Sequence, residues 1–422
     1  MSRVCITGIG AVCGAGLGPD AIWEAIAAGR SAVAPIQQWD VTGWPATLAA
    51  ELNGVDNRTL VEDRKLHKLI SRTDMLGLYA AGTAIQQSRL DTHRESLDEQ
   101  AAARFNDRSG IFAGSGGGTY KSNYDFFPAM TASGGKLEGF GREFSNSVNP
   151  MWLLRNLPNN VLCHVGIRHN FKGTNGCITN QCVGGALALT EAMFALRANE
   201  ADRVLAVGHD APIEPESVFH YHNLGLMATD ALRPFDAGRK GTIFGEGAGA
   251  VLLETESSAK ARQAPVLGEL LGAGSVTEAA GVVDLRSDGD GLRRAIELAF
   301  VDAGIAAKDV GMIVAHGNGT KASDASEAFA LRRVFGDAIP PIAAFKWAFG
   351  HLIAASGILD LIMALQALKH QIVPGIPTLK TVDPDLMPLP VSTQPQKPRS
   401  DIALVLCRGF AAMNVALLVR SV

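Results

Sequence analysis

The stretch Cys182-Val-Gly-Gly-Ala-Leu-Ala-Leu-Thr-Glu-Ala-Met-Phe-Ala-Leu-Arg197 and the short run Arg203-Val-Leu-Ala-Val207 that follows it decide the fold class. The first is rich in Ala and Leu, with apolar residues at helical spacing, and it predicts a helix. The second is short and apolar with β-branched residues, and it predicts a strand. Alternation of buried strands with helices is typical of an α/β architecture.

The same alternation recurs along the whole chain of 422 residues. Strands are predicted at Val4–Ile6, Gly110–Ala113, Arg203–Val207, Ala248–Glu254, Val310–Ala315, Ile402–Cys407 and Ala416–Val419. Helices are predicted at Ala21–Ala28, Asp74–Ser88, Val183–Arg197, Asp290–Ala303 and Ile358–His370. We therefore expect an α/β protein with one large core or two medium ones.

A polar, turn-like segment, Ser257–Pro265, separates two parts that each contain strands, helices and a glycine-flanked reactive residue. This predicts two similar halves, residues 1–255 and residues 256–422, with a site where they meet. The loop Gly114-Ser-Gly-Gly-Gly118 is interpreted as a tight turn. The opening Gly8-Ile-Gly10 lacks the GxGxxG spacing of dinucleotide-binding proteins, so we do not expect NAD binding.

Composition excludes several classes of function. The chain is 47% hydrophobic and 19% charged, with a formal net charge of −4 and no Lys/Arg stripe, which argues against nucleic acid as a partner. Its 6 Cys form no CxxC pair and no zinc-like cluster with His, so neither a metal site nor a disulfide framework is expected. No signal-peptide pattern and no apolar run of about 18 residues occur, which predicts a cytoplasmic protein without a membrane span.

Cys182 is the predicted nucleophile. A thiol at a helix start faces unpaired backbone N–H groups and the positive end of the helix dipole, and both favour the thiolate. Gly184 and Gly185 leave its sulfur approachable. Two histidines, His316 and His351, also lie beside glycines. One Cys with two such His predicts acyl transfer through a thioester.

Several further motifs occur in a fixed order around these residues. They are Ile6-Thr-Gly-Ile-Gly-Ala-Val12, Asn199-Glu-Ala-Asp-Arg-Val-Leu-Ala-Val-Gly208, Arg233-Pro-Phe-Asp-Ala-Gly-Arg239 leading to Gly245-Glu-Gly-Ala-Gly249, Ala315-His-Gly-Asn-Gly-Thr320, and Lys346 with Gly350-His351. Together they resemble the β-ketoacyl-acyl-carrier-protein synthases of the elongating type, in the thiolase-like superfamily, almost end to end. The resemblance implies a thiolase-like layered fold of two similar α/β halves with buried mixed sheets.

The resemblance also implies roles for the reactive residues. Cys182 would accept an acyl group from carrier-protein phosphopantetheine, and its backbone N–H and that of Phe410 would bind the thioester oxyanion. His316 and His351, as neutral imidazoles, would stabilise the enolate left when a malonyl thioester loses CO2. In comparable sites one oxyanion donor contributes about 3–4 kcal/mol.

Supporting residues are implied by the same motifs. Lys346 with Glu327 would form a buried charged pair that orders the histidine loops, with an ordinary salt bridge as the alternative. Asp324 follows the first histidine motif. Asn318 would contact the pantetheine arm, and Thr320 is a supporting or substrate-binding residue. No metal or cofactor is expected beyond the prosthetic arm of the partner.

Acyl carrier protein is the partner that the resemblance implies, together with a homodimer or a heterodimer with a ketosynthase-like subunit. The basic run from Lys65 to Arg72 is interpreted as a solvated helix face, or else as a docking spot for an acidic partner. Trp152 and Leu153 either line the acyl pocket or pack in the core.

The chain also departs from the family pattern. Asn180 and Gln181 precede the nucleophile where a small polar residue and Ala are common, and Asn318 replaces a Thr. The gate segment Cys407-Arg-Gly-Phe410-Ala-Ala-Met-Asn414 carries an Arg and extra methyl groups, which we expect to stiffen or reshape it. These departures favour a specialised polyketide- or polyene-type synthase.

Two alternatives remain open. A thiolase would need a second Cys as base, for which Cys407 is suitably placed, although the first histidine motif is a synthase feature. A catalytically silent chain-length-factor subunit would resemble a synthase but typically lacks the nucleophile, which is present here as Cys182.

Overall fold

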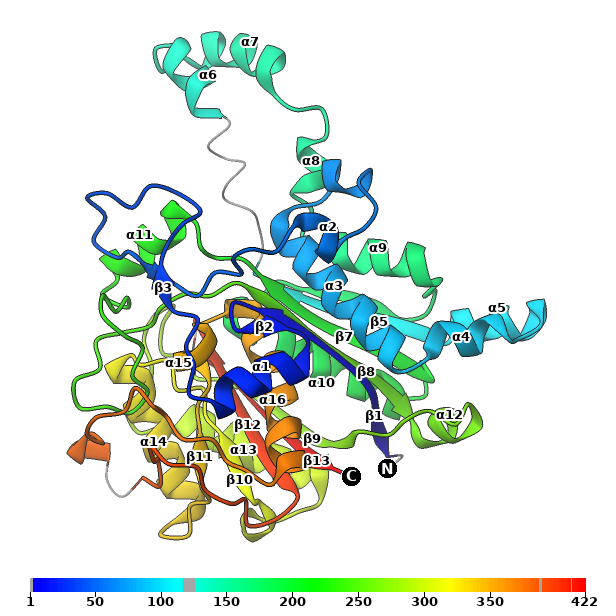
Figure 1. Cartoon of the computed structure of the whole chain (residues 1–422), viewed down its shortest axis with the longest axis vertical. Helices are drawn as coiled ribbons and strands as arrows, with labels where there is room; N and C mark the ends of the chain where they lie inside the picture. Colours follow the sequence, from blue (N-terminus) through cyan, green and yellow to red (C-terminus); the bar gives the residue numbers. More distant parts are fainter. Residues whose placement is uncertain (1–2, 117–125, 387–388, 411) are drawn as a thin grey trace.

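A mixed sheet runs through the centre of the molecule (Figure 1). The computed structural model describes residues 3–116, 126–386, 389–410 and 412–422. The strand order is β11-β10-β12-β13-β9-β1-β8-β7-β5-β6, with β2 beside β1, and β3 and β4 form a separate pair. The strands are β1 (Val4–Cys13), β2 (Gly16–Leu17), β3 (Ala34–Pro35), β4 (Leu48–Ala49), β5 (Ser109–Ser115), β6 (Asn175–Ile178), β7 (Arg203–Asp210), β8 (Gly247–Thr255), β9 (Gly268–Thr277), β10 (Met312–Val314), β11 (Ile342–Ala343), β12 (Ile402–Gly409) and β13 (Met413–Ser421).

The strand order repeats once along the chain. In β6-β5-β7-β8-β1 two parallel pairings are followed by two antiparallel ones, and β11-β10-β12-β13-β9 has the same sequence of pairings. The halves join where β1 meets β9, with Cys5 opposite Glu269. The predicted α/β fold with buried mixed sheets is confirmed. The boundary between residues 255 and 256 stays a prediction, and the segment after it begins as a helix, α12, and not as a turn.

Two helices lie at the centre, among the strands (Figure 1). Helix α10 (Gly184–Arg197) packs on β5 and β7, helix α16 (Ser356–His370) packs on β12 and β8, and the two helices contact each other. Every residue of α16 from Ser356 to Leu368 is buried, which explains why the helix is mostly apolar on all sides, with Asp360 and Gln366 as buried polar exceptions. By length and composition the stretch Ile353–His370 could span a membrane, but 89% of it is buried inside the protein.

The remaining helices cover the faces and edges of the sheet or lie in the connections. They are α1 (Pro19–Ala27), α2 (Asn57–Leu60), α3 (Arg72–Gln87), α4 (Leu90–Glu95), α5 (Glu99–Asp107), α6 (Phe127–Ala132), α7 (Leu137–Ser147), α8 (Trp152–Arg155), α9 (Asn160–His169), α11 (Pro215–Asn223), α12 (Glu256–Ala261), α13 (Asp290–Ala303), α14 (Lys321–Phe335) and α15 (Lys346–Phe349). The 3₁₀ turns are η1 (Leu66–Lys68), η3 (Gln181–Val183), η4 (Ala307–Asp309), η5 (Ile353–Ala355) and η6 (Pro384–Leu386).

All the predicted strands and helices are present, with ends shifted by a few residues or, for β1, by more. The sequence analysis missed β6, β9 and α14, among other elements, mostly short ones, that include α4, α5, α7, α9 and α11. In β9 the reason is its glycine content, since a Cβ at Gly274 would lie 2.1 Å from the carbonyl oxygen of Ala295 on α13. These glycines let α13 pack tightly on the strand while they lower its apparent β propensity. Part of the predicted tight turn Gly114–Gly118 falls outside the described residues.

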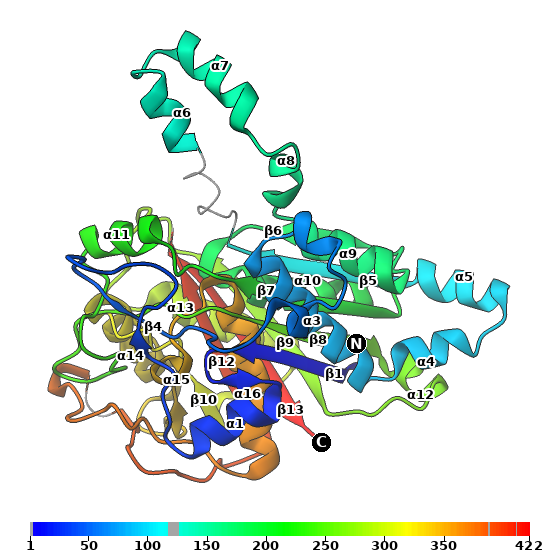
Figure 2. The same cartoon turned by 45° about the horizontal axis from the view of Figure 1, so that its top comes forward.

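Helices α6 and α7 project away from the sheets, and α8 leads back towards α9 (Figures 1 and 2). An aromatic cluster holds the projection together, because Phe126 packs against Phe144 and edge-on against Trp152. Several apolar side chains on it are exposed, among them Leu137 and Leu153.

Candidate active site

Cys182 lies in η3, the turn that leads into α10. The helix itself begins at Gly184, so the thiol precedes its first residue by one position more than predicted. Gln181 before it has φ 47°, in the left-handed region that non-glycine residues rarely occupy. A Cβ at Gly185 would lie 2.5 Å from the carbonyl oxygen of Ala354, so this glycine allows η5 to approach the start of α10 closely.

The protonation of Cys182 differs from the prediction. Burial raises the pKa of its thiol to about 12, and the nearby Lys346 ammonium opposes this rise without cancelling it. Asp210 adds to the rise. The resting nucleophile is therefore a thiol, because desolvation of the anion outweighs the helix start.

His316 begins the loop after β10, and Glu327 on α14 holds that loop in place. The backbone N–H groups of His316 and Gly317 donate to the two carboxylate oxygens of Glu327, at 2.8 and 3.0 Å. The backbone N–H of Arg408 donates to Nδ1 of His316 at 3.4 Å. Since Nδ1 faces a donor, the proton of the neutral ring is on Nε2.

His351 is held by the neighbouring backbone in a similar way. Its N–H donates to the carbonyl of Ile243 at 2.7 Å, and its carbonyl accepts from Gly245 at 3.0 Å. The backbone N–H of Ile353 reaches Nδ1 of His351 at 3.2 Å, and the Ser356 hydroxyl lies 3.0 Å from the same atom. This also places the ring proton on Nε2.

The two imidazoles face each other edge-on, with ring centroids 5.2 Å apart. Burial lowers the pKa of both well below the usual value, and the Lys346 ammonium lowers them further. Both rings are therefore neutral at physiological pH, and each carries an Nε2–H that can donate a hydrogen bond.

Lys346 does not pair with Glu327, the partner predicted from the sequence. Its Nζ lies 2.9 Å from Oδ2 of Asp360 on α16, and both side chains are fully buried. Glu327 is occupied by the loop of His316 instead. The positive charge of Lys346 lowers the pKa of both imidazoles, although neither Lys346 nor Asp360 is among the residues that line the cavity.

Asp324, Asn318 and Thr320 complete the histidine loop. Asp324 accepts from the N–H groups of Phe235, at 2.8 Å, and of Gly319, at 3.2 Å. Burial raises the pKa of its carboxyl to about 7. The side-chain oxygen of Asn318 accepts from both the N–H and the hydroxyl of Thr320, at 3.0 and 2.8 Å. Asp324 therefore fixes the position of the loop, and Asn318 and Thr320 form part of its surface.

One cavity of about 70 Å³ brings these side chains together. Its lining consists of Cys182, Tyr221, Leu226, Thr242, Val282, Val283, Leu285, His316, Asn318, Thr320, Ser323, His351, Arg408, Gly409, Phe410 and Ala412. The thiol, both imidazoles and the predicted gate residue Phe410 thus share it. Trp152 and Leu153 are absent from this lining, which gives no support to the pocket role, and the exposure of Leu153 shows that core packing is wrong for this residue.

Comparison with known proteins agrees with this geometry. Residues 1–259 match the family model of the β-ketoacyl synthase N-terminal domain, and residues 267–380 match that of the C-terminal domain. The chain belongs to the β-ketoacyl synthase family. Its family resemblance, stated above from motifs, is confirmed.

Individual members of this synthase family are similar along their whole length. The chain is 31% identical to Nodulation protein E of Rhizobium sp. (strain N33), covering 100% of this chain and 99% of that protein. It is 29% identical to 3-oxoacyl-[acyl-carrier-protein] synthase 2 of Rhizobium meliloti (strain 1021), with the same coverage. The solved structure of the ishigamide ketosynthase/chain length factor matches with a TM-score of 0.87 at 26% identity, covering 100% of this chain and 99% of that one.

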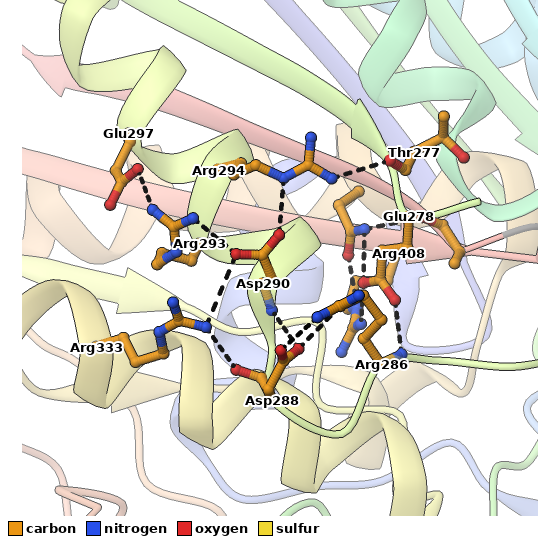
Figure 3. A network of polar contacts seen from close by, with 12 residues as sticks. Thr277, Glu278, Arg286, Asp288, Asp290, Arg293, Arg294, Glu297, Arg333 and Arg408 are labelled. Atoms are coloured by element: carbon orange, nitrogen blue, oxygen red, sulfur yellow. Dashed lines mark hydrogen bonds and ion pairs between the residues drawn. The ribbon is translucent and has the colours of Figure 1, made fainter. Parts of the chain in front are cut away.

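The gate of this synthase contains a buried ion pair that the sequence analysis missed. Arg408 donates to Glu278 at 3.0 Å, to the side chain of Asn414 at 2.8 Å and to the carbonyl of Ser323 at 3.1 Å. Figure 3 shows this pair continuing through Arg286, whose backbone N–H donates to Glu278, into ion pairs on α13 and α14. The pair joins the turn that carries Phe410 to the segment after β9.

The second thiol near the nucleophile is turned away from the chemistry. Cys407 Sγ donates to the carbonyl oxygen of Cys182 at 3.1 Å, and Cys407 is not among the residues that line the cavity. Burial raises the pKa of Cys407 far above its usual value. The base of a thiolase must accept a proton from the substrate and release it again. The thiol of Cys407 is poorly placed for that role.

The basic run from Lys65 to Arg72 is divided by the fold. Lys65 and Lys68 are exposed, but Arg72 binds both carboxylate oxygens of the buried Glu246 at 2.7 Å. Arg72 therefore belongs to an internal ion pair, and the predicted helix face is a 3₁₀ turn followed by the start of α3. Within the described ranges, no group of three or more His, Cys, Asp or Glu side chains could hold a metal ion.

Proposed function

We propose that this protein catalyses the decarboxylative condensation of an acyl thioester, held on Cys182, with malonyl-acyl carrier protein. The observation that carries the proposal is that one cavity contains a thiol and two neutral imidazoles with their Nε2–H groups available. The condensation is the activity of the family to which the chain belongs.

In the first step, Cys182 Sγ attacks the acyl carbonyl of the incoming thioester. The carbon–sulfur bond to the carrier arm breaks, and the thiol proton ends on the departing pantetheine sulfur. The backbone N–H groups of Cys182 and Phe410 are proposed to stabilise the oxyanion. Because the resting nucleophile is a thiol, sulfur attack and proton loss are coupled in this step.

In the second step, the malonyl thioester loses CO2. The electron pair of the broken carbon–carbon bond passes into an enolate, whose oxygen accepts hydrogen bonds from Nε2 of His316 and of His351. The resulting carbon nucleophile attacks the acyl group on Cys182, and the carbon–sulfur bond breaks to release a 3-ketoacyl thioester. The Cys182 thiolate that leaves takes up a proton from water and returns to the resting thiol. Neutral donors stabilise this enolate without holding the malonyl carboxylate in place as a full positive charge would.

Acyl carrier protein is the proposed source of both thioesters, as the name of the synthase 2 relative states for that protein. The second subunit is proposed to be a copy of this chain or a ketosynthase-like partner, and the cytoplasm is the proposed location. No resident metal or cofactor is proposed. Asn318 and Arg408 favour a specialised polyketide or polyene substrate over housekeeping fatty acids, because they change the polar lining of the cavity.

The alternatives are weaker on this geometry. A thiolase would use a second cysteine as base, and Cys407 is bonded to the backbone of Cys182 and lies outside the cavity lining. A silent chain-length-factor subunit would not need the thiol and both imidazoles assembled in one cavity.

The test is the intact mass of the protein after mixing with acyl-acyl carrier protein, followed by addition of malonyl-acyl carrier protein. We expect an acyl adduct on the wild type that is lost with CO2 release, and no adduct on Cys182→Ala. Cys163→Ala, which removes a partly buried thiol elsewhere, is the matched control and should still be acylated. Failure to acylate the wild type with several chain lengths would favour the silent subunit, and condensation of acyl-CoA without CO2 would favour the thiolase.

A further inference from the structure

Thr242 presents a buried hydroxyl on the wall of the active-site cavity. Its side chain is only 2% exposed, and it lines the cavity beside Leu226. Its main chain is fixed, since its N–H donates to Leu226 at 2.7 Å and its carbonyl accepts from Ala228 at 2.8 Å. Within the part of the chain that the structure describes, its Oγ1 has no hydrogen-bond partner.

An unpaired buried hydroxyl is costly. Leaving such a group without a partner costs about 1–3 kcal/mol, and nearly all buried polar groups in native proteins are paired. Valine has almost the same shape and carries no polar group, so it would fill the position without that cost. The hydroxyl of Thr242 is thus explained if its partner comes from the contents of the cavity.

Several other polar atoms of the cavity lining already have partners. Nδ1 of each histidine faces a backbone N–H, the Asn318 oxygen accepts twice from Thr320, and the guanidinium of Arg408 is bonded to Glu278 and Asn414. Besides the Nε2–H groups of His316 and His351, which the proposed function assigns to the enolate oxygen, the hydroxyl of Thr242 remains available to a ligand.

The surroundings of Thr242 indicate what that ligand is. A Cβ at Gly319 would lie only 2.7 Å from the carbonyl oxygen of Gly241, so the segment of Thr242 packs directly against the loop of Asn318 and Thr320. The same cavity is also lined by the apolar Val282, Val283 and Leu285. Such a lining suits a flexible chain that alternates amide groups with short hydrocarbon segments, as the phosphopantetheine arm does.

We propose that the hydroxyl of Thr242 donates a hydrogen bond to an amide carbonyl of the phosphopantetheine arm and thereby helps to position the thioester. The inference rests on the proposed function, because the arm enters this cavity only if the protein handles carrier-bound thioesters. Thr242 is a substrate-positioning residue in this proposal and takes no part in bond making.

The experiment compares wild type, Thr242→Val and Thr242→Ser with malonyl-pantetheine and malonyl-N-acetylcysteamine, which retains only the amide nearest the sulfur. Removal of one neutral hydrogen bond should raise KM about 3- to 10-fold in Thr242→Val with kcat retained, and Thr242→Ser should restore KM. A rise with both thioesters identifies the near amide, and a rise with malonyl-pantetheine alone identifies the far one. Thr242→Val should fold at least as stably as the wild type.

Two results would overturn the inference. One is an unchanged KM in Thr242→Val with both thioesters. The other is a defect that appears only when the acyl chain itself carries an oxygen, since the hydroxyl would then contact the acyl group. Calorimetric binding of pantetheine alone separates the two proposals. If the wild type binds it more tightly than Thr242→Val but no variant condenses, the inference stands and the proposed function fails.

Discussion

The two halves of the sheet share one strand order but contribute differently to the site. In each half a buried helix follows a 3₁₀ turn that contains a residue in the left-handed region, Gln181 with φ 47° before α10 and Ile353 with φ 45° before α16. In the first half the next residue is Cys182, which reaches the cavity. In the second half it is Ala354, whose carbonyl lies against Gly185.

This difference shows how one backbone arrangement serves two purposes. In the first half the turn presents a thiol. In the second half the same turn aims the N–H of Ile353 at Nδ1 of His351 and so fixes its tautomer. The second half adds a further loop for His316, which Glu327 holds. In the proposed function, the first half therefore supplies the nucleophile for acyl loading, and the second half supplies both histidines for decarboxylation together with the oxyanion donor Phe410.

The largest effect expected from this division is in His351→Ala. Loss of one enolate donor should lower the rate of CO2 release from malonyl-acyl carrier protein by about 10²- to 10³-fold, while acylation of Cys182 continues. Radiolabelled CO2 release and intact mass measure the two steps separately. His316→Ala should behave in the same way. The division fails if acylation falls as much as decarboxylation, because His351 would then act on the thiol.

The second prediction concerns the buried ion pair between Arg408 and Glu278, both of which belong to the second half. Glu278→Gln leaves the buried Arg408 charge without its counter-ion, which should lower the free energy of unfolding by about 3–5 kcal/mol. Urea unfolding measures this. The double variant Glu278→Leu with Arg408→Met removes both charges and should recover most of the loss. Equal instability of the single and double variants would show that lost packing, and not the unpaired charge, causes the loss of stability.

The third prediction tests the two turns directly. If both are strained by their positive φ, glycine should be more stable than alanine at residue 181 and also at residue 353. We expect Gln181→Gly to exceed Gln181→Ala by about 1 kcal/mol in unfolding free energy, with a similar difference between Ile353→Gly and Ile353→Ala. Each pair loses the same side-chain contacts, so the difference isolates the backbone. Alanine variants that equal or exceed their glycine partners would remove the parallel between the halves.

The smallest effect is expected from pH. Because the pKa of His316 and of His351 lies well below 6.5, both rings stay neutral as the pH falls through 6.5. The rate of CO2 release should therefore be flat between about pH 8 and pH 6, with its loss only at lower pH. An inflection near 6.5 that disappears in a histidine variant would show that one ring titrates normally and would contradict the proposed neutral pair.

Much of the fold was predictable because its signals are local. The helix over Val183–Arg197 follows from helical spacing and composition, and the strand at Arg203–Val207 follows from a short β-branched run. The motif around His316 predicted its loop, and Cys182 was identified by its place at a helix start. Strand β9 escaped detection because its glycines serve contacts with α13 that lie elsewhere in the chain.

The sequence by itself determined the α/β class, the family, and the three residues that meet in the cavity. Only the tertiary structure decided that Lys346 pairs with Asp360, that Cys182 rests as a thiol, and that Arg408 is neutralised by Glu278. The physical reason is the distance along the chain over which each kind of interaction acts. Spacing and propensity act between near neighbours, whereas the partner of a buried charge and the desolvation of a thiol depend on segments brought together from distant parts of the chain.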